Sequence, residues 1–292
     1  MKNNASVIPE KFGIAWHPQL PAAKTEAEKV AEFLRRHTGN APEVSPLNDP
    51  QFRAKILAKR FDMVITLGGD GTMLRTGKLC AVPEIPVMGI NMGHLGFIIE
   101  TVSDSWKERV LKLLSGEYEV DRRMMLHAER HCGDERIREW EVLNDAVVGR
   151  GNEFRPVHLR VKINYSVLEE IVADGLIVST ATGSTAYAMA ASGPILPPNM
   201  RNMLLVPIAP HLCLDRTLVL PEDAIVEIQV NGYVDCSFCP DGIASFPLER
   251  GDEIIVRASK YSAKFVRFEE ESAFYSKFVR KMLRRSVFDN FE

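Results

Sequence analysis

Long apolar runs are missing from this 292-residue sequence. No stretch approaches the roughly 20 apolar residues that a helix needs to cross a bilayer, and the first residues contain no apolar core of the kind found in signal peptides. A surplus of positive charge is missing too, because the net charge is -3 at pH 7. Such a chain offers no attractive field to nucleic acid or to an anionic membrane. We therefore expect neither as a partner.

Cysteine is scarce, and its count of five is odd. Scattered, unpaired cysteines argue against a disulfide framework and favour a reducing compartment, so we expect a cytoplasmic protein. Cys236 and Cys239 have the spacing of a zinc-binding pair, but a structural zinc site needs a second pair, and only His131-Cys132 is available. We interpret the two as thiols beside a turn and expect no metal bound by side chains. Internal repeats and low-complexity tracts are absent as well.

The hydrophobic content of 46% and the charged content of 26% are typical of a globular protein. In the first part of the chain, apolar strand patterns alternate with helix patterns. The strands are expected at 12–16, 61–67 and 85–90, and the helices are expected to begin at a Thr25–Glu28 capping box, at Asp49-Pro50 and at Ser103-Asp104. This alternation predicts a Rossmann-like α/β domain whose parallel sheet binds ligands at the carboxyl ends of its strands.

The pattern changes after about residue 118, where strands follow one another. They are expected at 124–132, 139–150, 157–163, 167–171, 204–208, 217–220, 224–230 and 252–258. Alternation of apolar and polar residues over 157–163 indicates one buried and one wet face. We therefore predict an α/β domain over 1–117, an all-β domain of sandwich type over 118–268, and a C-terminal helix over 269–292 with one apolar and one basic face.

The stretch Leu67-Gly68-Gly69-Asp70-Gly71-Thr72 lies between a buried strand and a helix. Glycines allow the backbone to approach an anion and to adopt positive φ, and the N–H groups of the turn then point at that anion. Asp70 does not fit a pure phosphate cradle, since its carboxylate would repel phosphates unless it has a chemical task. Accepting a proton from an attacking hydroxyl is such a task. The alternative is an ordinary turn, in which Asp and Gly are common.

A second stretch, 174–187, again reads as a strand, a turn of small residues and a helix. Two independent loops of this kind suggest two halves of one site. The alanines at 186, 188 and 190 permit close approach of a ligand, or alternatively only tight packing.

At these residues the sequence resembles the NAD kinase family. The resemblance runs through 68–72, 89–97, Asn144-Asp145, 174–194, 207–211 and 240–242, and thus covers most of the chain. It implies transfer of the γ-phosphoryl group of ATP to the 2′-hydroxyl of the adenosine ribose of NAD, with Mg²⁺ or another divalent cation on the triphosphate. It also implies a homodimer or homotetramer built through the β-rich domain, and a C-terminal helix that packs on the first domain.

The resemblance implies roles for individual residues. Asp70 would be the catalytic base. The substrate-binding residues would be Gly68, Gly69, Asp70, Gly71, Thr72, Arg75, Asn144, Asp145, Arg155, Asp174, Thr185, Ala186, Tyr187, Ala188, Met189, Ala190 and, as a weaker candidate, Asp241. Asp174 would lie near the nicotinamide end across a subunit boundary, and 185–190 would enclose the adenine. Ala181 replaces a usual proline, and Val172 a basic residue of some members.

Several alternatives remain open from the sequence. His94 is interpreted as a solvated loop histidine, Arg155 as a possible surface ion pair, and Asn144-Asp145 as a possible turn or bulge. A lipid kinase of the diacylglycerol type shares the Gly-Gly-Asp-Gly loop but would need an apolar acceptor pocket. A non-catalytic dinucleotide-binding protein would gain nothing from a carboxylate beside phosphates.

Overall fold

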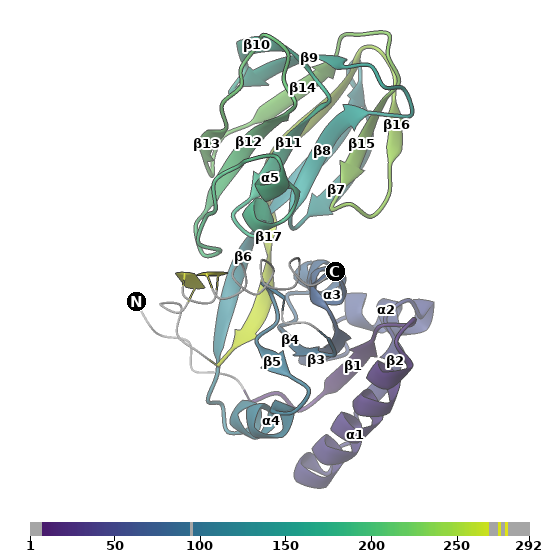
Figure 1. Ribbon diagram of the computed structural model, residues 1–292. Coiled ribbons are helices and arrows are strands. Elements are labelled where there is room, and N and C mark those ends of the chain that lie inside the picture. The colour runs from purple at the N-terminus through teal and green to yellow at the C-terminus, as the bar shows by residue number, and fades with distance from the viewer. Residues whose placement is uncertain (1–7, 94–95, 269–273, 276–277, 280–292) are drawn as a thin grey trace, which may run out of the picture. The chain divides into compact units, whose positions relative to one another are not determined.

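The computed structural model describes residues 8–93, 96–268, 274–275 and 278–279 (Figure 1). The chain folds as two compact units. Unit 1 comprises Met1–Arg122 with Ala263–Glu292, and unit 2 comprises Arg123–Ser262. Two strands, β6 and β17, contribute residues to both units.

Unit 1 is an α/β unit with a parallel sheet in the order β5-β4-β3-β1-β2, and the end of β17 pairs with β4 through Phe265 and Val87. The strands are β1 (Phe12–Trp16), β2 (Glu43–Pro46), β3 (Met63–Gly68), β4 (Val87–Asn91) and β5 (Thr101–Val102). Every residue of β3 and β4 is buried, which is expected of central parallel strands covered on both faces. The predicted alternation and parallel pairing are confirmed.

In the described part of this unit before β6, the helices are α1 (Pro21–Thr38), α2 (Pro50–Leu57), α3 (Asp70–Ala81) and α4 (Trp106–Leu114). The predicted cap of α2 is confirmed, because Asp49 Oδ1 accepts the N–H groups of Gln51 and Phe52 at 2.8 and 3.0 Å. The predicted end of α1 is confirmed as well, since Gly39 adopts φ 75° there.

Two predicted helix starts were wrong. Helix α1 begins at Pro21 and not at the Thr25 capping box, because proline is preorganised for the first helical position and the buried stripe already starts at Ala23. Helix α4 begins at Trp106, after Ser105, and not at Ser103-Asp104. Among the described residues, no helix is both long enough and apolar enough to span a membrane.

Unit 2 is a β-sandwich, as predicted. Its strands are β6 (Glu119–Cys132), β7 (Glu135–Val142), β8 (Asp145–Arg150), β9 (Val157–Ile163), β10 (Ser166–Ala173), β11 (Gly175–Thr180), β12 (Asn202–Ile208), β13 (Leu218–Pro221), β14 (Val226–Val230), β15 (Cys236–Pro240), β16 (Phe246–Leu248) and β17 (Asp252–Arg267). One antiparallel sheet has the order β13-β12-β11-β8-β15-β16. In the other, β10, β9, β14 and β17 are neighbours, and β6 pairs with both β17 and β7.

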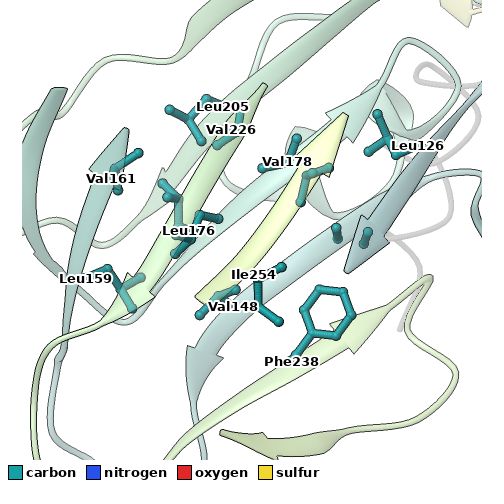
Figure 2. Close-up of a cluster of buried hydrophobic side chains, with 14 of the residues drawn as sticks. Leu126, Val148, Leu159, Val161, Leu176, Val178, Leu205, Val226, Phe238 and Ile254 are labelled. Carbon is teal, nitrogen blue, oxygen red and sulfur yellow. The ribbon is translucent and has the colours of Figure 1, made fainter. Parts of the chain in front are cut away.

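Apolar side chains from both sheets form one buried cluster (Figure 2). Leu159 and Val161 come from one sheet, and Val148, Leu176 and Phe238 from the other. Along β9 the buried positions alternate with exposed His158 and Arg160, which confirms the predicted wet and dry faces.

The strand predicted over 139–150 is interrupted at Leu143 and Asn144, which lie between β7 and β8. The side chain of Asp241 explains the break, because it accepts the backbone N–H groups of both residues. Strands β15 and β16 were not predicted. Strand β17 also continues beyond the predicted end at 258, to Arg267.

The predicted C-terminal helix lies mostly outside the described residues. Of its expected span, only 274–275 and 278–279 are described. The ring of Phe278 lies 5.9 Å from the ring of Phe97, and both residues belong to unit 1.

Candidate active site

The glycine-rich turn joins buried strand β3 to helix α3, as predicted. A Cβ on Gly68 would lie 2.3 Å from Thr72 Oγ1, so this position requires glycine. A Cβ on Gly69 or Gly71 would have no atom of the described residues within 4 Å. Positive φ was also expected for the turn, but none of its three glycines has it, and Gly69 has φ -102°. The glycines therefore provide close packing and open backbone without an unusual conformation.

Asp70 is the first residue of α3 and is partly buried. Its carboxylate accepts three backbone N–H groups from the segment that follows β4. Oδ2 accepts the N–H of Phe97, and Oδ1 accepts those of Ile98 and Ile99 at 3.1 and 3.2 Å. A negative charge at the first turn of a helix is further stabilised by the helix dipole. The Asp70 carboxylate is thus held in a fixed orientation beside the open glycines.

Gly96 was not assigned a role from the sequence, although its loop was noted there. A Cβ at this position would lie 2.0 Å from the Asp70 carboxyl carbon, which no real side chain could occupy without moving the carboxylate. The signal for this role was the glycine itself, in a loop that follows the neighbouring strand. His94, in the same loop, lies outside the described residues.

The other predicted residues of this turn differ in accessibility. Thr72 is buried, and its Oγ1 has no hydrogen-bond partner among the described residues. Its carbonyl accepts the hydroxyl of Thr76 at 2.9 Å. Arg75, one turn further along α3, is exposed.

In unit 2, three of the predicted residues, Asn144, Asp145 and Asp241, lie together and are joined by hydrogen bonds. Asp241 Oδ1 accepts the N–H of Asn144 at 2.7 Å, and its own N–H donates to the carbonyl of Asp145 at 2.8 Å. Asp241 has φ 54°, a conformation that aspartate tolerates better than most residues. The weaker candidate Asp241 thus positions the two stronger ones.

The Asp145 side chain sits at the centre of this arrangement with only 5% of its surface exposed. Burial, reinforced by the nearby charge of Asp241, raises the pKa of Asp145 to about 7, although a hydrogen bond from the backbone of Tyr187 opposes the shift. The Oδ1 atom of Asn144 is buried without a hydrogen-bond partner among the described residues. Such an acceptor is suited to a donor group on a ligand.

A pocket of about 400 Å³ opens within unit 2, and one of its lining residues, Tyr187, donates its backbone N–H to Asp145. The lining includes Asp174, Tyr187, Arg150 and Phe154. Arg150 lies 3.5 Å from the Asp174 carboxylate and 4.8 Å from the centre of the Phe154 ring. Two predicted residues, Asp174 and Tyr187, are thereby brought to one pocket. Arg155 is exposed in the adjoining loop and is not one of its lining residues.

The small-residue segment is not one continuous helix. Gly183–Thr185 forms a single 3₁₀ turn and Tyr187–Ala190 a single α turn, while Ala186 between them is non-helical. Thr185, Ala186 and Met189 are partly buried, and Ala190 is exposed. Ala188 has no exposed surface and packs with Leu196 and Val206 in a core cluster. This burial favours the tight-packing alternative for Ala188, and its assignment to the adenine pocket stays a prediction.

Cys236 and Cys239 do not form a chelating pair. They are three residues apart on strand β15, so their side chains point to opposite faces. Cys236 belongs to the core, where burial raises the pKa of its thiol to about 12, and Cys239 lines the pocket.

The predicted residues therefore form two sets. Gly68, Gly69, Asp70, Gly71 and Thr72 lie together in unit 1, with Arg75 on the following turn. In unit 2, Asn144, Asp145, Asp241 and Tyr187 are linked by hydrogen bonds, and Asp174 joins Tyr187 at the pocket.

Comparison with known proteins gives the same family for both units. Residues 18–118 match the ATP-NAD kinase N-terminal domain, and residues 143–268 match the ATP-NAD kinase C-terminal domain. The chain is 36% identical to an NAD kinase of Dehalococcoides mccartyi over 286 residues, which is 96% of this chain and 99% of that protein. It is 40% identical to an NAD kinase of Chloroflexus aurantiacus over 279 residues, which is 95% of this chain and 99% of that protein.

Two solved structures share the fold. A yeast NADH kinase complexed with NADH superimposes with a TM-score of 0.80 at 24% identity, covering 89% of this chain and 84% of that one. An NAD kinase from Archaeoglobus fulgidus in complex with ATP gives a TM-score of 0.72 at 23% identity, covering 92% and 97%. With both domains matched and the curated relatives aligned over nearly their full length, this chain belongs to the NAD kinase family.

Proposed function

We propose that this protein transfers the γ-phosphoryl group of ATP to the 2′-hydroxyl of the adenosine ribose of NAD, giving NADP. Family membership supports the reaction. The observation that carries it is the Asp70 carboxylate, held by three backbone N–H groups at the start of α3 beside open glycines. This is the placement required of a fixed base next to a phosphate donor.

Asp70 acts as the general base. Each carboxylate oxygen offers about two lone-pair sites. In the described part of the chain Oδ2 accepts only one N–H, from Phe97, so a lone pair remains for the ribose hydroxyl. A ribose hydroxyl is a very weak acid, and the base therefore acts in the transition state, as the O–P bond forms and the proton leaves.

The turn 68–72 holds the donor, which is ATP with its Mg²⁺ or another divalent cation. Phosphoryl transfer depends on positioning and charge neutralisation more than on covalent chemistry. In the part of the chain that the structure describes, a Cβ on Gly69 or Gly71 would meet nothing within 4 Å, so phosphate oxygens have room to approach the backbone there. The cation neutralises the triphosphate and offsets the repulsion from Asp70.

The dinucleotide is held by residues of unit 2. Asn144 offers its unpartnered Oδ1 to a donor group of the adenine or ribose, and Asp145, Asp174 and Tyr187 provide polar contacts beside the pocket. Thr185, Ala186, Met189 and Ala190 supply the small surface around the adenine. Arg155 is the cation for the dinucleotide phosphates. We further propose a cytoplasmic homo-oligomer, and the five free cysteines support the reducing compartment.

The test is direct. The purified protein is incubated with NAD, ATP and MgCl₂, and NADP is measured with an NADP-specific dehydrogenase. A parallel reaction offers diacylglycerol vesicles in place of NAD. We expect NADP only when ATP is present, and no phosphorylated lipid. Lipid phosphorylation, or NAD binding without any NADP, would overturn the proposal.

The Asp70→Asn variant tests the assigned base. We expect a fall in kcat of roughly 10²–10⁴-fold, with the Kd for NAD changed less than about threefold, which is under 1 kcal/mol. A variant that keeps more than about half of the wild-type rate would remove Asp70 from the role of a general base, since such a base contributes far more.

A further inference from the structure

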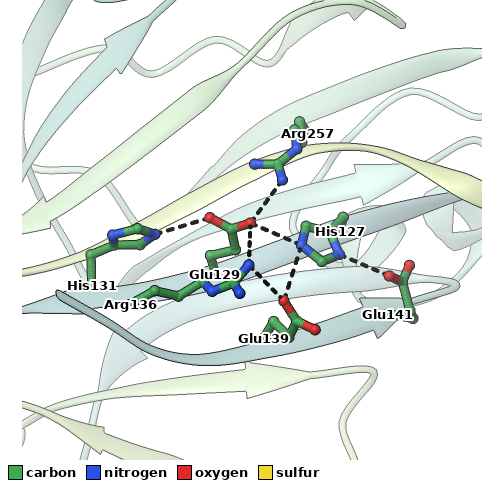
Figure 3. Close-up of polar contacts among 7 residues, drawn as sticks. All are labelled: His127, Glu129, His131, Arg136, Glu139, Glu141 and Arg257. Atoms are coloured by element: carbon green, nitrogen blue, oxygen red, sulfur yellow. Dashed lines mark hydrogen bonds and ion pairs between the residues drawn. The ribbon is translucent and has the colours of Figure 1, made fainter. Parts of the chain in front are cut away.

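A second cluster of chemically active side chains, none of them assigned a role above, lies on the β6–β7 hairpin of unit 2 (Figure 3). His127, Glu129 and His131 occupy alternate positions of β6, so they share one face of the strand. The hairpin register places Glu141 opposite His127 and Glu139 opposite Glu129. Two histidines and three carboxylates therefore converge on one small area.

Both ring nitrogens of His127 face carboxylate oxygens. Nδ1 lies 2.8 Å from Glu141 Oε1, while Nε2 lies 3.0 Å from Glu129 Oε1 and 3.9 Å from Glu139 Oε2. A neutral imidazole carries only one N–H. With that hydrogen on Nδ1, donated to Glu141, Nε2 turns a lone pair toward two carboxylates. A metal ion between the three groups would accept this lone pair and bind both carboxylates.

The charges of the cluster also favour a bound cation. The three carboxylates of Glu129, Glu139 and Glu141 face two guanidinium groups. Arg257 lies 2.7 Å from Glu129, and Arg136 lies 2.9 Å from Glu139 and 3.6 Å from Glu129. Among these five groups one negative charge is left over, and a bound cation would neutralise it.

We propose that His127 Nε2, Glu129 and Glu139 bind a divalent transition-metal ion, with Zn²⁺ as the natural occupant. Imidazole with carboxylates is a donor set that Zn²⁺ uses. Tetrahedral bonds of about 2.1 Å place ligand atoms about 3.4 Å apart, and the distances of 3.0 and 3.9 Å from Nε2 to the two carboxylates bracket that value.

Two neighbours orient the ligands. Glu141 on Nδ1 fixes the His127 ring with Nε2 toward the ion, which is the carboxylate–histidine–metal arrangement common in metal sites. His131 Nε2 lies 2.9 Å from the other oxygen of Glu129 and holds that carboxylate in place. The site joins the two strands of the hairpin and is independent of the proposed reaction.

Arg136 competes with the ion, because it contacts both carboxylates that would bind it. Its side chain is 55% exposed, so it can swing into solvent when the ion enters. Removing it should strengthen metal binding. A purely structural ion-pair network predicts no such gain.

The experiment uses the full-length protein without a histidine tag, stripped with EDTA and dialysed, and titrated with ZnCl₂ by calorimetry in the absence of nucleotide. The variants are His127→Gln, Glu139→Gln and Arg136→Ala. The matched control is His158→Gln, which removes an exposed strand histidine from β9 outside the cluster. Thermal melting verifies that each variant folds. If His127→Gln does not fold, Glu139→Gln provides the test, because the Glu139 side chain is half-exposed.

We expect one Zn²⁺ to bind per chain. The Zn²⁺ affinity should be at least tenfold weaker in His127→Gln and Glu139→Gln, unchanged in His158→Gln, and severalfold tighter in Arg136→Ala. Absence of a Zn²⁺ site in the wild type would overturn the proposal. Equal affinity in the wild type and the ligand variants, or no tightening in Arg136→Ala, would overturn it too.

Discussion

At the scale of single residues, the position of Asp70 depends on a neighbour that carries no side chain. Gly96 packs where a Cβ would lie 2.0 Å from the Asp70 carboxyl carbon. Replacing Gly96 with alanine should push the carboxylate away from the N–H groups of Phe97 and Ile98 that now hold it. We expect Gly96→Ala to lower kcat at least tenfold, because small displacements of catalytic groups are costly.

Gly93 offers the matched control for this prediction. It lies in the same loop, and a Cβ there would meet no atom of the described residues within 4 Å. Initial rates of NADP formation are measured for both alanine variants, together with their melting temperatures. Equal activity in Gly96→Ala and Gly93→Ala would show that Gly96 does not position Asp70.

Asp145 gives a prediction about pH. Its pKa is raised to about 7 in the folded protein by burial and by the charge of Asp241, from an ordinary value of 3.8. Between these two values the folded state holds a proton that the unfolded state has lost. The free energy of unfolding therefore falls as pH rises, by up to about 1.4 kcal/mol per pH unit, and the loss is complete once pH exceeds the folded pKa.

Urea unfolding of the wild type and of Asp145→Asn at pH 5, 6, 7 and 8 isolates this contribution, since asparagine stays neutral. The wild type should lose stability relative to the variant from pH 5 to about pH 7, and little more above pH 7. A difference that is constant across the series, within about 0.5 kcal/mol, would mean that Asp145 is already ionised in the folded protein at pH 5.

At the scale of elements, Ala186 and Ala188 stand two residues apart with opposite surroundings. Ala188 is fully buried against Leu196 and Val206, whereas Ala186 is partly exposed. Ala188→Leu overpacks a core, which typically costs about 1–3 kcal/mol and lowers the melting temperature by several degrees. Ala186→Leu should instead weaken NAD binding and leave the melting temperature nearly unchanged.

Measuring NAD affinity and thermal melting on both variants separates packing from binding. Unchanged affinity in Ala186→Leu together with a clear loss of stability would mean that Ala186 is also a packing residue. In that case the adenine would have to be bound elsewhere.

The elements that the sequence predicted well are those whose pattern is local. The apolar run of β3, the Asp49-Pro50 start of α2 and the alternation in β9 each carry their signal within a few residues. The elements that were predicted incorrectly are shaped by contacts between residues distant in sequence. Asp241, almost 100 residues away in sequence, interrupts the strand at Leu143 and Asn144. The sequence around 143–144 contains no pattern that predicts this interruption.

The candidate site divides in the same way. Asp70 could be singled out because a carboxylate in a predicted phosphate-binding turn would repel phosphates unless it has a chemical task. Its partners could not, because they are backbone N–H groups of 97–99 supplied by the loop after a neighbouring strand. The role of Gly96 is likewise visible only when the two loops are placed together.

At the scale of the whole molecule, the open question is whether a site needs residues from two chains. Family resemblance implies that Asp174 serves the site of a neighbouring subunit. Unit 2 also exposes large apolar side chains that an interface would cover, among them Phe154 (90% exposed) and Tyr233 (87% exposed). We therefore expect light scattering to find at least a dimer at assay concentrations.

Mixing two inactive variants tests the shared site itself. Asp70→Asn and Asp174→Ala are each expected to be inactive, the first through loss of the base and the second through loss of a dinucleotide contact. If Asp174 acts in the neighbour's site, a mixed oligomer contains sites with Asp70 from one chain and Asp174 from the other. Random exchange in a symmetric oligomer makes about a quarter of the sites intact. The mixture should therefore recover about a quarter of the wild-type rate after subunit exchange, whereas Asp70 and Asp174 acting within one chain would give no more activity than the two variants measured separately.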